Sequence, residues 1–106
     1  MLKLILNGIV GKDAEVKEVG QRKAINFDVA VSMDYKNSNG EKVERTEWVR
    51  AVMWRGEKQS TKVADFLKKG QRVIIEGIPG SEGYKSKEGT IKSALQVNVK
   101  DLELLN

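Results

Sequence analysis

The chain has 106 residues, of which 40% are apolar and 32% charged, and its 19 basic and 15 acidic side chains give a formal charge of +4. This composition excludes a disordered chain and predicts one globular domain, residues 1–106, of the reducing cytoplasm, whose basic charge favours an anionic partner. The sequence contains neither cysteine nor histidine, which excludes disulfides, the usual zinc sites and histidine-based catalysis. No run of residues is apolar enough to span a membrane, and the amino terminus is not a signal peptide. Only carboxylates and lysines remain for catalysis, and none cluster in the sequence, so we expect neither an enzyme nor a cofactor.

The first third of the chain predicts three strands. Residues 1–10 are apolar with alternating leucines, and Gly8 and Gly11 fit a bend or bulge near their end. Residues 14–19 predict a shorter second strand. Residues 24–33 alternate strictly between apolar and polar side chains, which predicts one buried face, with Phe27 in the core and Met33 at the end of that face.

Residues 34–43 break this alternation and predict a long hairpin loop that turns at Asn39-Gly40. Residues 44–55 return to a strand that contains both tryptophans of the chain. One face of this strand is small and apolar, as expected for a core. The other face interleaves Trp48 and Trp54 with Arg50.

Two interpretations of this aromatic face remain open from the strand alone. Stacking rings beside a cation suit the flat bases and the charged backbone of a single-stranded nucleic acid. Aromatic side chains also favour strands and cores, so the same alternation fits two buried tryptophans.

Residues 57–69 predict the one helix, in which Val63, Phe66 and Leu67 share a side that packs on the sheet. The hydroxyl residues at 60–61 can cap its start, and the glycine at 70 ends it.

The last third predicts a strand at 71–77, a second long loop at 78–89 and a closing strand at 90–104. Regular strand spacing without βαβ repeats favours an antiparallel barrel or sandwich. The expected fold class is therefore all-β with one short helix. The count is five or six strands, depending on the short one at 14–19, with the helix before the penultimate strand. A five-stranded Greek-key barrel with a helix between its third and fourth strands and with long hairpin loops is the OB-fold, which binds oligonucleotides on its sheet face, and this is the fold we expect.

The sequence resembles the bacterial-type single-stranded-DNA-binding proteins over nearly its whole length. The resemblance rests on four motifs in order: LNGIVGKD at 6–13, AINFDVAVS at 24–32, ERTEWVR at 44–50 and FLKKGQRVIIEG at 66–77. It implies an OB-fold that binds and protects single-stranded DNA without sequence specificity during replication, repair and recombination. It also implies a homotetramer.

The resemblance implies a base-stacking role for four aromatic side chains. Trp48 matches the tryptophan of the family's Thr-Glu-Trp motif, and Trp54 stands where the family usually has a phenylalanine. Tyr35 and Tyr84 stand beside the first and second long hairpins, where the family carries aromatics, and Arg50 matches the arginine after the motif. Cations on the strand face or in its flanking loops are expected to contact phosphates: Lys36, Lys42, Arg50, Arg55, Lys85 and Lys87.

The chain departs from the family pattern in ways that affect its partners. Val49 replaces a histidine that the family uses in subunit contact, so a homotetramer is expected first and a dimer second. Ala14 replaces a common proline, and residues 78–84 carry no arginine where the family loop is often basic, which predicts a lower affinity. The sequence ends at Asn106 without the family's flexible linker and acidic tip, so we expect no tail-dependent protein partners.

Two other function classes remain. A primosome-type OB-fold module for assembly or protein interaction is the alternative, and burial of Trp48 and Trp54 in a subunit interface would favour it. An enzyme acting on nucleic acid has almost no catalytic side chains to use.

Overall fold

The computed structural model describes the backbone of residues 1–85 and 91–105, and the side chains of residues 1–80 and 95–105. Strands dominate it, with one short 3-10 helix, η1 (Lys62–Phe66). The strands in chain order are β1 (Leu4–Val10), β2 (Glu15–Val19), β3 (Arg22–Ser32), β4 (Tyr35–Lys36), β5 (Lys42–Val43), β6 (Thr46–Gly56), β7 (Arg72–Lys85) and β8 (Ile91–Leu105).

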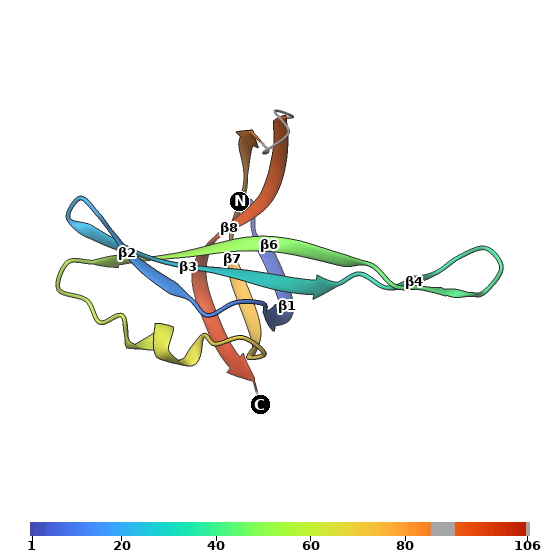
Figure 1. Cartoon of the computed structure of the whole chain (residues 1–106), viewed down its shortest axis with the longest axis horizontal. Coiled ribbons are helices and arrows are strands. Elements are labelled where there is room, and N and C mark those ends of the chain that lie inside the picture. The colour runs from blue at the N-terminus through green and yellow to red at the C-terminus, as the bar shows by residue number, and fades with distance from the viewer. Residues whose placement is uncertain (86–90, 106) are drawn as a thin grey trace.

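Among the described residues, five long strands close into a barrel in the order β1-β7-β8-β6-β3, and β3 returns to pair with β1. All neighbours are antiparallel except β6 and β8, which are parallel. β2 extends the barrel wall as a hairpin on β3. Figure 1 shows β3 and β6 running side by side, with η1 below them and the β4 hairpin reaching well beyond the barrel. This arrangement confirms the predicted OB-fold.

The core follows the period-two pattern of the sequence. Ile25, Phe27 and Val29 of β3 are buried as predicted, but Met33 is 50% exposed because β3 ends at Ser32. The buried core cluster consists of Leu6, Val10, Ile25, Phe27, Val29, Val49, Ala51, Met53, Ala64, Leu67, Val73, Ile75, Val97 and Val99.

The predicted helix at 57–69 is largely wrong. Only the turn of η1 forms, and Ala64 and Leu67 pack into the core while Phe66 is 60% exposed. Burial of these two side chains cannot stabilise three turns of a short isolated helix, since helices of this length depend on tertiary packing. The Ser60 Oγ accepts a hydrogen bond from the Lys62 N–H at 3.1 Å. Within the described residues, no helix is long and apolar enough to cross a membrane.

The predicted loop at 78–89 is also wrong in its first part, because β7 continues to Lys85. Pro79 favours a loop when the sequence is considered alone. β1 pairs with β7 only as far as Gly77, so beyond that point the second edge of β7 has no partner strand among the described residues. A proline is tolerated on such an edge because its missing N–H removes no ladder hydrogen bond.

The first long hairpin forms as predicted, with β4 and β5 as its short ladder. The Asn37 side chain accepts hydrogen bonds from the backbone N–H groups of Asn39 and Glu41, at 3.0 and 2.9 Å. Gly40 has φ +77°, the left-handed conformation that this turn requires. This turn closes the hairpin, which we call the β-arm (residues 35–43).

Candidate nucleic-acid interface

Trp48, Arg50 and Trp54 of β6 lie on the outer face of the barrel wall. The alternate residues of the same strand, Val49, Ala51 and Met53, are buried in the core, so the aromatic set faces away from it. The cross-strand partners on β3 are small or polar: Ala30 opposite Trp48, Asp28 opposite Arg50, Asn26 opposite Val52 and Ala24 opposite Trp54. We call this surface, formed by the outward residues of β3 and β6, the aromatic face.

Trp48 is 56% exposed, so it is not a core residue of this chain. Its position depends on Gly11, in the connection that follows β1. A Cβ atom at Gly11 would lie 2.8 Å from Cη2 of the indole and closer still to Cζ3. The glycine therefore lets the indole lie against the backbone while the rest of the ring remains open to a ligand.

Trp54 is half-buried. Ala24, its direct partner on the same face, is only 3% exposed although it points away from the core, because the large indole lies beside it. Arg22 lies over the ring with its Cζ 4.3 Å from the ring centroid. The aromatic face thus carries one open indole and one that a guanidinium already covers.

The charges on this face are mixed. Arg50 is exposed and stands across the strand pair from Asp28. Arg55 alternates to the opposite side of β6 from Trp54, is half-buried, and donates from Nη1 to the Trp54 carbonyl oxygen at 3.2 Å. The structure therefore brings Arg50 together with both tryptophans, whereas Arg55 belongs to the other side of the strand.

The β-arm carries Tyr35, Lys36 and Lys42 away from the aromatic face (Figure 1). All three side chains are exposed. The Nζ of Lys42 lies 3.7 Å from Oδ2 of Asp34, and Oδ1 of the same carboxylate accepts a hydrogen bond from the Arg45 backbone N–H at 3.0 Å. That N–H, with a smaller contribution from Lys42, holds the pKa of Asp34 below its ordinary value. The charge of Lys42 is thus partly balanced within the arm.

The remaining predicted site residues cannot be placed as side chains. Tyr84 and Lys85 end β7, but their side chains lie outside the described part of the chain. Lys87 lies outside the described residues altogether.

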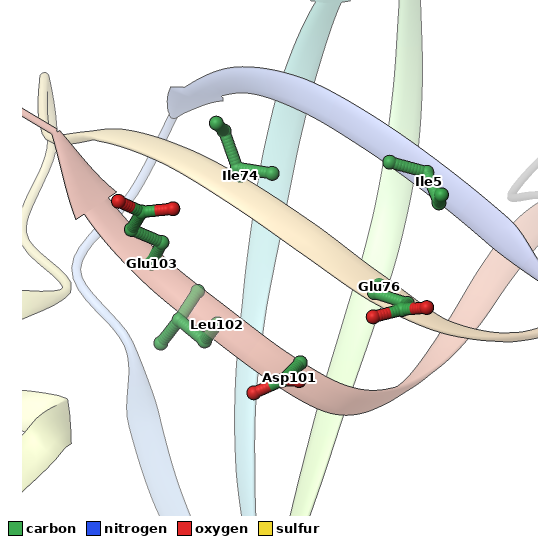
Figure 2. A pocket seen from close by; sticks show the side chains of 6 residues that line it. All are labelled: Ile5, Ile74, Glu76, Asp101, Leu102 and Glu103. Atoms are coloured by element: carbon green, nitrogen blue, oxygen red, sulfur yellow. The ribbon is translucent and has the colours of Figure 1, made fainter.

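The outer surface of β1, β7 and β8 has the opposite character. Figure 2 shows the carboxylates of Glu76, Asp101 and Glu103 around a pocket that Ile5 of β1 and Ile74 of β7 also line. The volume of this pocket is about 260 Å³. Lys3 forms an ion pair with Glu76. Three carboxylates in one pocket repel a polyanion, so this surface is unsuited to nucleic acid and the aromatic face is the better candidate.

Sequence reasoning missed two residues of the site. Arg22 was not singled out, although it precedes Ala24 by two residues and so shares the face of Ala24 by alternation. The second is Gly11, which the sequence predicts with Gly8 at a bend but not as a neighbour of Trp48, because that packing joins segments far apart in sequence.

Residues 1–105 match the single-strand binding protein family. A single-stranded DNA-binding protein of Neisseria meningitidis is 36% identical over 104 residues, which are 97% of this chain and 59% of that protein. The mitochondrial single-stranded DNA-binding protein of Drosophila melanogaster is 30% identical over 95 residues, or 90% of this chain and 64% of that protein. The chain therefore spans less than two thirds of the length of these relatives.

Solved structures share the fold. The Plasmodium falciparum SSB in complex with ssDNA matches with a TM-score of 0.79 at 24% identity, over 100% of this chain and 96% of that chain. The small single-stranded DNA-binding protein of Streptomyces coelicolor matches with a TM-score of 0.75 at 13% identity, over 97% of this chain and 93% of that chain. Since the family match extends over nearly the whole sequence and agrees with the barrel, this chain belongs to the single-strand binding protein family.

Proposed function

We propose that this chain binds single-stranded DNA without sequence specificity, by stacking bases on Trp48 and Trp54 and contacting phosphates with nearby cations. The observation that carries the proposal is the aromatic face, where two indoles and Arg50 lie side by side on the outside of a barrel wall. Bases stack on aromatic rings regardless of their identity, and cations follow the backbone, so the site reads no base edges.

The family relationship supports the same function, because the members named above are single-stranded DNA-binding proteins. Members of this family are non-enzymatic. Protection of single strands during replication, repair and recombination, in the cytoplasm, is the biological role we propose for it.

The test is a fluorescence titration with an oligothymidylate, followed by competition with duplex DNA. Bases stacked on Trp48 or Trp54 should quench the emission strongly, and duplex of equal length should compete poorly because its bases are already stacked. Alanine in place of either tryptophan should weaken binding by about 1–3 kcal/mol, the usual loss for one stacked base. Equal affinity for duplex and single strand would contradict the proposal.

We also propose that the chain assembles through β1, as a homotetramer first and a dimer second. β1 pairs with β7 from Leu4 to Ile9 but with β3 only at Ile9 and Val10, so most of its second edge is unpaired within the described chain. Ile5 on this strand is 65% exposed. An apolar strand with an open edge is a ready site for pairing with another subunit. Val49, where the family has a contact histidine, is buried in the core of this chain, which is why a dimer stands as the second possibility.

A further inference from the structure

Arg22 occupies one face of the Trp54 ring. Its Cζ lies 4.3 Å from the ring centroid, which is within the range of a cation–π contact. Arg22 begins β3 and pairs with Gly56 of β6, while Ala24, two residues on, pairs with Trp54 itself. Because Ala24 is buried beside the indole and Arg22 covers one face of the ring, a base that stacks on that face has to compete with Arg22.

A guanidinium is flat and stacks on an indole much as a base does, so the two cannot share one ring face. A cation–π contact at an exposed site contributes roughly a two- to fivefold factor to an equilibrium constant. A stacked base contributes roughly five- to 150-fold. The base therefore displaces the guanidinium.

Once displaced, the Arg22 side chain can bind a phosphate of the DNA. Arg22 is exposed, and no ion pair joins it to an acidic side chain in the part of the chain that the structure describes. It follows the two-residue turn at Gly20 and Gln21, at the turn end of the β2–β3 hairpin. Its long side chain can leave the ring and reach the phosphate of the nucleotide that has replaced it.

We propose that Arg22 is a displaceable cap on Trp54: it covers the stacking face in the free protein, and on binding it moves from the indole to a phosphate of the same strand. This inference rests on the function proposed above and adds to it a binding residue and an exchange of partners. Arg22 thereby weakens stacking on Trp54 and strengthens the electrostatic part of binding.

The exchange predicts a specific salt dependence for Arg22→Gln. Because the variant binds one phosphate fewer, the slope of log affinity against log salt should become shallower by about 0.7. At low salt the variant should bind more weakly than the unmodified protein. At high salt, where phosphate binding contributes little, it should bind roughly two- to fivefold more tightly, because no cation has to leave the ring. The two lines should therefore cross.

The matched control is Lys23→Gln, which removes the same charge one residue away on the opposite face of β3; its line should follow that of the unmodified protein. In a Trp54→Ala background, Arg22→Gln should lose its advantage at high salt, since no ring remains to be uncovered. Circular dichroism and thermal unfolding establish that each variant is folded, and Arg22→Ala serves as a second variant.

A second measurement needs no DNA affinity. The sequence has two tryptophans, so Trp48→Phe leaves Trp54 as the single fluorescent indole. In that background, Arg22→Gln should increase the acrylamide quenching of the free protein, while the DNA-bound forms should be protected equally.

Other outcomes overturn the inference. If the plot of log affinity against log salt for Arg22→Gln runs parallel to that of the unmodified protein and below it, Arg22 does not move to a phosphate. It would then stack on the bound base from the side opposite Trp54. A plot that coincides with that of the unmodified protein would mean that Arg22 has no role in binding. In both cases the unmodified protein still binds and Trp54→Ala still weakens it, so the proposed function stands. If the unmodified protein fails to bind the oligothymidylate, the proposed function itself has failed, and the cap with it.

Discussion

Gly11→Ala tests whether the position of the Trp48 ring, and not only its presence, determines binding. The new Cβ would lie 2.8 Å from Cη2 and closer to Cζ3, whereas carbon atoms in contact prefer about 3.5–4.0 Å. The ring must therefore move outward by roughly 1 Å, and it can, because Trp48 is 56% exposed. We expect binding to weaken by up to about 1–3 kcal/mol, the contribution of one stacked base.

The fold should tolerate this change. Gly11 is not among the described glycines with positive φ, so alanine meets no backbone strain there. Its N–H donates to the Asp28 carbonyl oxygen at 2.9 Å, a bond that alanine keeps. The free energy of unfolding should therefore change little, by about 0.5 kcal/mol, as is usual for surface substitutions. Thermal unfolding measures this, and fluorescence titration with oligothymidylate measures binding.

Two controls make the result decisive. Gly80→Ala adds the same methyl group where no atom of the described residues lies within 4 Å, and it should bind as the unmodified protein does. In a Trp48→Ala background, Gly11→Ala should cause no further weakening because the ring it displaces is absent. Normal binding by the single variant, or an equal effect in both backgrounds, would refute the argument that Gly11 acts through Trp48.

Further expectations concern charge, the arm and assembly. Trp54→Ala should lower affinity at every salt concentration without changing the slope of log affinity against log salt, whereas Arg50→Gln should make that slope shallower by about 0.7 for each phosphate that the side chain no longer binds; a collapsed slope in the tryptophan variant would reverse these roles. Asp28→Asn removes a negative charge opposite Arg50 and should raise affinity at low salt, measured by the same titration. Tyr35→Ala should weaken binding less than either tryptophan variant, because the arm carries it away from the aromatic face. An equal effect would mean that the bound DNA contacts the arm as closely as it contacts the aromatic face. Light scattering should give a tetramer at micromolar concentration, and a monomer would contradict pairing through β1.

The sequence by itself determined the barrel and its inner face. Period-two alternation at residues 24–33 and 44–55 has one physical cause, the opposite directions of successive side chains in a strand. It therefore identified Phe27 as core and grouped Trp48, Arg50 and Trp54 on one face without reference to the tertiary structure. The resemblance to the family predicted that the same residues bind nucleic acid.

Tertiary packing decided what local patterns could not. The helix predicted at 57–69 shortened to η1 because the barrel accepts only Ala64 and Leu67 from it, and helical spacing alone cannot report how much of a helix its partner will bury. β7 can run through Pro79 because β1 begins at Leu4, beside Gly77, and leaves the edge beyond it without a partner strand in the described residues.

The same holds for the site. Alternation placed Trp48 and Trp54 on one face but could not tell an open ring from a covered one. That difference arises from Gly11, which is 37 positions from Trp48 in the sequence, and from Arg22, which the β3–β6 register brings beside Trp54. Residues so far apart in sequence meet only in the folded chain. The tertiary structure alone therefore determined which of the two indole rings is open and which is covered.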